Sequence, residues 1–168
     1  MGLLHKLRGA GAPLPPRPPL RPILLAWLGV FLAITAVGLL KLSLAQEFVL
    51  GSFGATCVLA FGFPDVPFSQ PRNIVLGHTL SSACGLAFLS VCGNTWWAMA
   101  AAVGTAIALM MATGTVHPPA GSNPVIVFLI QPGWAFLWMP TLAGALVVTL
   151  VALFYNNAVR EGPYPRYW

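Results

Sequence analysis

Hydrophobic residues along this chain are gathered into six stretches, which short polar or Pro- and Gly-rich stretches separate. The first stretch is long enough for a helix that crosses a bilayer, which takes about 20 apolar residues. The second and fifth stretches are shorter, and glycine or proline interrupts them. The pattern predicts six helical segments, at residues 23–45, 48–63, 72–92, 95–116, 120–130 and 134–155.

The two halves of the chain resemble each other. When GATCVLAF (54–61) is laid over GSNPVIVF (121–128), the glycine, valine and phenylalanine positions match, and the same offset lays the first three segments over the last three. We therefore expect an all-α membrane protein whose six hydrophobic segments form two repeats of long helix, short broken or re-entrant helix, and long helix. Paired broken segments indicate a transporter binding site, because irregular backbone at membrane depth survives only inside protein or beside water.

Two topologies fit this pattern. If the short segments cross the bilayer, the chain has six spans in two inverted halves; if they re-enter, it has four spans in two parallel halves. Both place the two termini on one side, which the Lys and Arg residues near the chain ends assign to the cytoplasm. The loop that carries Arg72 is cytoplasmic only in the six-span arrangement, which favours that arrangement.

The composition places most of the chain in lipid. Hydrophobic residues make up 58% and charged residues 7%, whereas a soluble domain has about 25% charged residues. The net charge of +5 comes mainly from the chain ends, so we interpret it as membrane topology rather than nucleic-acid binding. We expect no cleavable signal peptide, because the first apolar run is too long for one.

We divide the chain into three parts. Residues 1–22 form a Pro-rich basic cytoplasmic tail, residues 23–156 a transmembrane domain, and residues 157–168 a cytoplasmic or interfacial tail whose Tyr164, Tyr167 and Trp168 suit the headgroup zone. The expected location is the cell (inner or plasma) membrane, with both termini cytoplasmic.

The stretch HPPAGSNP (117–124) carries the clearest candidate site. Its prolines should end the preceding helix near His117, so that Gly121, Ser122 and Asn123 open a short helix. Free N–H groups and the positive end of the helix dipole make such a start an anion site. The alternative is that Ser122 or Asn123 only caps the helix. The matching residues of the first half are Gly54, Ala55 and Thr56.

Two histidines and an arginine add candidate chemistry. An ionisable residue in a membrane segment is a functional hypothesis by default, and His117 and His78 can change charge near neutral pH. The alternative for each is a neutral, structural imidazole that bonds to a neighbouring polar group. Arg72, next to Asn73 at the start of the third segment, is either an electrostatic lure for an anion or an interfacial anchor.

Other chemistry is not expected. The acidic residues lie near segment ends, which argues against a cation pump and against metal transport. No nucleophile–base pair, metal-ligand motif or phosphate loop is recognisable, so we predict no enzyme, no cofactor and no metal site. Small residues at helical spacing, such as Gly77-Ser81-Gly85 and Ala100-Gly104-Ala108, predict close packing either between the halves or in a homo-oligomer.

Three blocks of residues carry a family resemblance. FGATCVLAF with QPRNIVLGH, then HPPAGSNP, and then LFYNN with YPRYW resemble, in this order, the signature blocks of the HPP family of integral membrane proteins over about residues 22–168. Ser122-Asn123-Pro124 is more polar than the family's usual HPPAGA and following small or apolar residue. The resemblance implies four membrane spans and, from plant members, nitrite transport. It marks these signature positions: Pro71, Arg72, Asn73, Gly77, His78, His117, Pro118, Pro119 and Gly121.

The sequence thus predicts a small transporter or channel for an inorganic anion, with nitrite as the expected substrate, membrane lipid around it and a second copy as partner. The anion is expected near amide donors at 121–123 and 54–56, with His117 or His78 supplying charge. The alternative is a non-transporting membrane sensor or scaffold whose basic tail recruits a partner.

Overall fold

The computed structural model describes residues 13–44 and 50–168, and the side chains of residues 13–39 and 50–168. Every element in this part of the chain is helical, which confirms the predicted all-α class. The elements are α2 (Leu20–Leu44), α3 (Gly51–Cys57) with its π-helical continuation η1 (Val58–Gly62), the 3-10 turn η2 (Pro67–Ser69), α4 (Pro71–Cys92), α5 (Trp96–Ala112), the 3-10 turn η3 (Pro118–Ser122), α6 (Asn123–Ile130), the π-helical η4 (Leu137–Leu142) and α7 (Ala143–Val159).

Three of these helices are long and apolar enough to cross a membrane: Leu20–Leu39, Pro71–Cys92 and the continuous Leu137–Val159. The second and fifth segments form short apolar helices, Gly51–Gly62 and Pro118–Ile130, as their interrupted sequences predict. The fourth segment is shorter than predicted, because α5 ends at Ala112 rather than near His117. Gly114 there adopts a φ of +64°, which turns residues 113–117 back towards α4.

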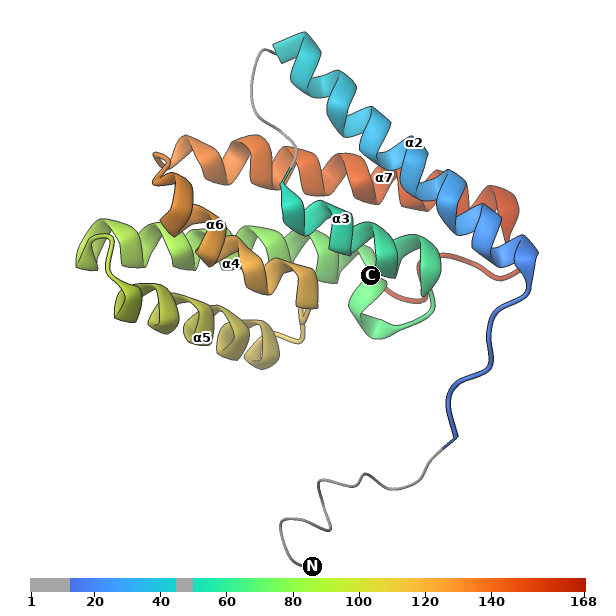
Figure 1. Ribbon diagram of the computed structural model, residues 1–168, viewed down its shortest axis with the longest axis horizontal. Helices are drawn as coiled ribbons and strands as arrows, with labels where there is room; N and C mark the ends of the chain where they lie inside the picture. The colour runs from blue at the N-terminus through green and yellow to red at the C-terminus, as the bar shows by residue number, and fades with distance from the viewer. Residues whose placement is uncertain (1–12, 45–49) are drawn as a thin grey trace, which may run out of the picture.

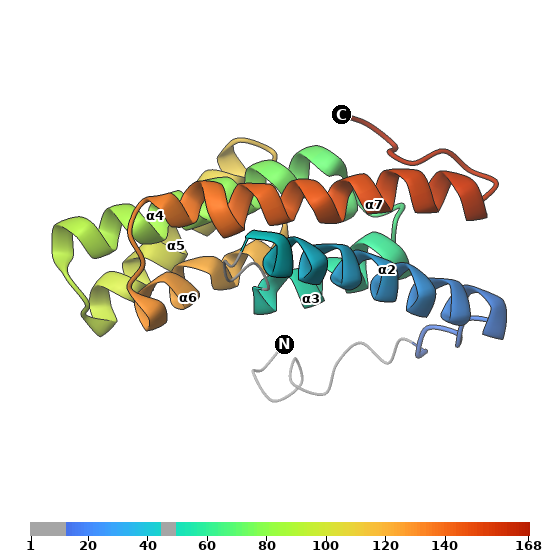
Figure 2. The same cartoon turned by 90° about the horizontal axis from the view of Figure 1, so that it is seen from above.

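The helices lie roughly along one long axis, with α4 and α7 side by side (Figures 1 and 2). Helix α2 packs against α7, α5 packs against α4, and the short helices α3 and α6 run in opposite directions from the middle of the molecule. The start of α2 and the end of α7 lie at one end of this axis, and the C-terminal tail runs back from there towards the turn at 63–70 (Figure 1). The linkers at 93–95 and 131–136 lie at the other end.

Glycines let the short helices approach the long ones closely. A Cβ on Gly144 would collide with the Phe53 ring, and a Cβ on Gly85 would lie 2.8 Å from Pro124 Cα. The stripe of small residues on α4 that the sequence indicates therefore packs inside the molecule, where it joins the two halves. Gly104 on α5 has no neighbour within 4 Å in the described part of the chain, so that second stripe faces outward.

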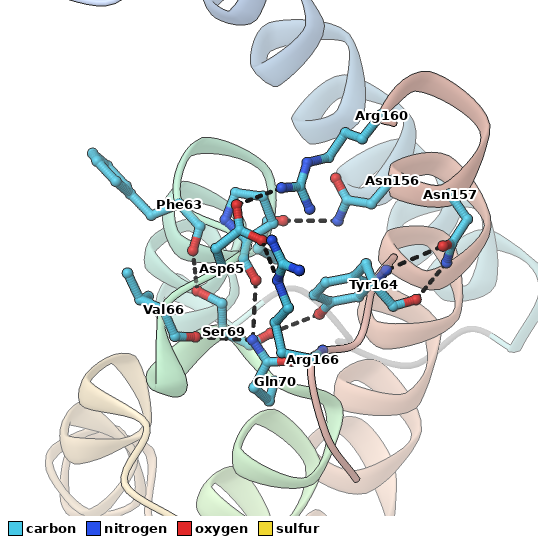
Figure 3. A network of polar contacts seen from close by, with 12 residues as sticks. Phe63, Asp65, Val66, Ser69, Gln70, Asn156, Asn157, Arg160, Tyr164 and Arg166 are labelled. Carbon is cyan, nitrogen blue, oxygen red and sulfur yellow. Dashed lines mark hydrogen bonds and ion pairs between the residues drawn. The ribbon is translucent and has the colours of Figure 1, made fainter. Parts of the chain in front are cut away.

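The C-terminal tail folds back over the turn at 63–70 (Figure 3). The carboxylate of Asp65 pairs with Arg160 and with Arg166, whose Nε lies 2.7 Å from Oδ1. The hydroxyl of Tyr164 donates to the backbone carbonyl of Ser69 at 2.6 Å. Tyr164 is thus only 2% exposed, contrary to its expected place among headgroups, because its ring fills the space between the tail and this turn. Trp168, at 75% exposed, is free to reach the interface.

Candidate functional site

A buried polar cluster lies where α3, α4 and the HPP stretch meet. It contains His78 on α4, His117 just before η3, Thr56 on α3 and Asn123 at the start of α6, and all four are 0% exposed. The two imidazole ring centroids are 5.0 Å apart. Polar side chains buried at this depth need hydrogen-bond partners within the protein, because hydrocarbon offers none.

The cluster forms a hydrogen-bond chain with a defined direction. The side-chain amide nitrogen of Asn123 faces both the His78 carbonyl (3.2 Å) and His78 Nδ1 (3.0 Å), so it donates and Nδ1 accepts. The proton of neutral His78 is then on Nε2, which donates to Thr56 Oγ1 at 2.8 Å. His117 Nδ1 donates to the carbonyl of Phe68 at 2.7 Å, which leaves Nε2 of neutral His117 to accept from Thr56 at 2.9 Å.

Thr56 has a second acceptor within reach. Its Oγ1 also lies 3.0 Å from the backbone carbonyl of Ser52. A hydroxyl has one proton, so Thr56 donates either to His117 Nε2 or to this carbonyl. If His117 takes up a second proton, its Nε2 becomes a donor and the Thr56 proton turns to Ser52. The hydroxyl of Thr56 therefore couples the protonation of His117 to the first turn of α3.

A second layer of contacts holds the HPP stretch in place. Ser81 donates to the carbonyl of Ala120 at 2.6 Å, and the Asn73 amide donates to the carbonyl of Val116 at 3.0 Å. Ser82 Oγ lies 2.9 Å from the Asn123 amide nitrogen and 3.1 Å from Thr141 Oγ1. These contacts order a stretch that two prolines prevent from forming ordinary helix.

Sequence reasoning missed part of this layer. Ser81 and Ser82 follow His78 at spacings of three and four, which place them on one face of α4. This polar face in an apolar helix is a signal that sequence inspection can find. Thr141 in η4 and the carbonyl of Phe68 have no such signal, because only the folded chain brings them to the cluster.

A groove lies next to the cluster, between η3 on one side and α3 with the start of η1 on the other. Its volume is about 510 Å³, and its mostly apolar wall is formed by Gly51, Ser52, Ala55, Val58, Leu59, Pro118, Pro119 and Ser122. The hydroxyl of Ser52, which is 3% exposed, has no hydrogen-bond partner among the described residues. The helix starts lie well inside the bundle, because Phe53 contacts Gly144 and the Ala120 carbonyl contacts Ser81. The groove is thus where the N-terminal ends of the two short helices meet.

The structure separates the predicted site residues into groups. His78, His117, Thr56 and Asn123 form the buried cluster, and Ala55 and Ser122 line the groove. Asn73 holds residues 114–116 in place. Gly54 and Gly121 adjoin open space, with no neighbour within 4 Å of a built Cβ in the described part of the chain. Arg72 lies apart, on an apolar surface that it shares with Trp168.

The predicted amide donors lie elsewhere. Gly54 and Thr56 are past the first turn of α3, where helix N–H groups are already bonded, so the free donors are those of Gly51 and Ser52. On the other side the helix starts at Pro118 and Pro119, which have no N–H, and the N–H of Asn123 bonds to Ala120. Ser122 does not cap α6 either, since its hydroxyl donates to the carbonyl of Pro119.

Comparison with known proteins decides the family. The family described as "HPP, transmembrane region" matches residues 15–165. The chain therefore belongs to the HPP transmembrane family. This HPP protein is 37% identical, over 166 aligned residues, to each of two transmembrane proteins of Dictyostelium discoideum. The alignments cover 92% of this chain but only 58% and 53% of those relatives, so it spans little more than half of their length. No solved structure matches it.

Proposed function

We propose that this HPP protein is a transporter or channel that carries a small inorganic anion, with nitrite as the expected substrate, without converting it chemically. Membership of a transmembrane family supports a membrane protein. One observation supports a transported anion in particular. The N-terminal ends of α3 and of the η3–α6 segment meet at one groove, which lies next to the buried hydrogen-bond chain His78–Thr56–His117.

The electrostatics of the groove favour an anion. Each helix start is the positive end of a helix dipole, and two such ends point at the same space. The N–H groups of Gly51 and Ser52, in the first turn of α3, can donate to a ligand. The described acidic residues, Asp65 and Glu161, line a different cavity, and none of the residues that line the groove is acidic.

The histidine chain suits proton-coupled movement of such an anion. A weak-acid anion crosses a membrane at lower electrostatic cost with a proton beside it, and an imidazole can accept and release a proton. Thr56 connects the groove to His117, because the carbonyl that competes for its proton belongs to Ser52 in the groove wall. We assign to His117 the role of carrying the proton. His78, which donates to Thr56, sets the donor-to-acceptor direction of the hydrogen-bond chain.

The arrangement supports two inverted repeats and six crossings. The packing of α2 on α7 corresponds to that of α5 on α4, and the two short helices point in opposite directions. Arg21 at the start of α2 and Arg160 at the end of α7 lie at one end of the bundle, which supports a cytoplasmic location of that end by the positive-inside rule.

The open side of the groove supports the proposed homo-oligomer. Gly54, Ala55 and Val58 are exposed on the outer face of α3. Hydrocarbon there would leave the first N–H groups of α3 without partners, which the bilayer interior does not tolerate. A second copy that covers this face, with water and the anion between, would satisfy these groups.

The test is uptake into liposomes that contain the purified protein, with nitrite, nitrate, formate, bicarbonate and chloride compared. We expect uptake of nitrite that an inward proton gradient accelerates and that His117→Ala reduces. His5→Ala, in the N-terminal tail, is the matched control and should transport as the wild type does. Absence of uptake for all five anions would reject the transporter and favour the membrane sensor or scaffold.

A further inference from the structure

A second cavity lies at the arginine-rich end of the bundle, outside the groove and the histidine cluster. It has a volume of about 420 Å³ and lies between the first turn of α2, the end of η1 and the end of α7. None of its lining residues belongs to the buried cluster. A ligand of this cavity would therefore occupy a different site from the transported anion.

The cavity has a charged mouth and an apolar floor. Arg21 in the first turn of α2 and Arg160 at the end of α7 line the mouth. Leu25, one turn further along α2, and Phe61 and Tyr155 form the inner wall. The charged side chains thus lie at the helix ends and the apolar side chains lie deeper, which matches the positions of the headgroup and the acyl chains of a lipid in one bilayer leaflet.

The two guanidinium groups have unused donors. Arg160 uses one nitrogen to bind Asp65, but its Nη1 is buried and has no partner in the described part of the chain. Arg21 makes no hydrogen bond or ion pair with any described residue. A buried guanidinium nitrogen without an acceptor is costly, and a phosphate group satisfies guanidinium donors in a two-pronged geometry.

The remaining charge indicates which headgroup fits. Asp65 is already bound by Arg160 and Arg166, as Figure 3 shows. Glu161 also lines the cavity and pairs with none of the described residues. The mouth thus offers two guanidinium groups for a phosphate and one carboxylate for an ammonium group. A free phosphate ion has no group that matches Glu161.

We propose that this cavity binds a single phospholipid whose headgroup joins a phosphodiester to an ammonium group, as in phosphatidylethanolamine. Arg21 and Arg160 hold the phosphate, Glu161 holds the ammonium group, and an acyl chain lies along Leu25, Phe61 and Tyr155. The bound lipid would fasten α2, which has an extensively exposed face, to the end of α7.

Native mass spectrometry of the full chain, released from detergent micelles, tests the proposal. The probes are phosphatidylethanolamine, phosphatidylglycerol with the same acyl chains, and sodium phosphate alone. We expect one retained phosphatidylethanolamine per protein and weaker retention of phosphatidylglycerol. Arg21→Gln should weaken retention of both lipids by about tenfold, the effect of one lost charge-assisted contact. Arg17→Gln, which removes the same charge outside the cavity, should change nothing.

Glu161→Gln tests recognition of the ammonium group separately from recognition of the phosphate. It should reduce retention of phosphatidylethanolamine towards that of phosphatidylglycerol without lowering the latter. Equal retention by the wild type and Arg21→Gln would overturn the site, and competition by sodium phosphate as effective as that of the lipid would overturn the lipid as its ligand. A preference for phosphatidylglycerol that Glu161→Gln leaves unchanged would overturn the role of Glu161.

Discussion

Thr56→Val tests the hydrogen-bond chain with the smallest change in shape. Valine has nearly the shape of threonine but has no hydroxyl, so the packing around residue 56 stays close to that of the wild type. His78 Nε2 and His117 Nε2, which lie 2.8 Å and 2.9 Å from Thr56 Oγ1, both lose their partner. Both rings are 0% exposed, so water does not replace the hydroxyl.

The expected loss of stability follows from these two contacts. Hydrogen bonds between membrane helices contribute about 0.6 kcal/mol each on average, which gives a lower limit of about 1 kcal/mol for two. A buried polar group left without a partner costs about 1–3 kcal/mol, which gives about 4 kcal/mol for two groups at the middle of that range. We therefore expect Thr56→Val to lower the free energy of unfolding by about 1–4 kcal/mol.

Unfolding with increasing sodium dodecyl sulfate in mixed micelles measures this loss. Thr79→Val is the matched control, because Thr79 donates only to the Val75 carbonyl, 2.8 Å away within α4. That carbonyl keeps its helical N–H partner, so the control should lose a few tenths of a kcal/mol, as expected for a contact within one helix. If the two variants are equally stable, Thr56 does not join the histidines.

Two further substitutions test the packing and the end of the bundle. Gly77→Ala places a Cβ 2.8 Å from His117 Cβ and should destabilise the fold by about 1–3 kcal/mol. The control is Gly104→Ala, whose Cβ meets no described neighbour within 4 Å, so this variant should be neutral or stabilising. Equal thermal stability of the two variants would refute this packing. The hydrogen bond from Arg160 holds the pKa of Asp65 below its ordinary value, so the contribution of this pair is complete above about pH 4 and disappears as the pH falls through the lowered pKa. Between pH 5 and pH 3, which bracket about pH 4, the melting temperature of Asp65→Asn should therefore fall less than that of the wild type. The expected difference is small, because the carboxylate is about half exposed. An equal fall in the melting temperature of both proteins would contradict this role of Asp65.

The sequence was sufficient for the helical class because apolar runs bounded by proline and glycine leave few alternatives in a membrane protein. It also identified His78 and His117, since an ionisable residue inside an apolar run stands out. It did not predict that the two rings are in contact or that the Thr56 hydroxyl joins them. That meeting depends on how residues 113–117 turn back along α4, which is fixed by the φ of Gly114 and by the Asn73 amide.

The start of the second short helix was predicted at the wrong residue, for a different reason. The sequence HPPAGSNP predicts a helix that starts at Gly121 with free N–H groups. The prolines instead form the first turn of a 3-10 helix, so the start moves to residues that have no N–H. Proline is compatible both with a break before a helix and with the first turn of one. The folded chain has the second arrangement, in which Ser81 donates to the Ala120 carbonyl.

The most direct test of the central claim is nitrite uptake into liposomes by Ala55→Phe. Ala55 is exposed and lines the groove at the meeting of the two helix starts, so a phenylalanine there fills the groove while the fold has room for it. Ala108→Phe, on the exposed face of α5, is the control. The account predicts that Ala55→Phe abolishes uptake and Ala108→Phe preserves it. Undiminished uptake by Ala55→Phe would show that the anion does not pass through this groove.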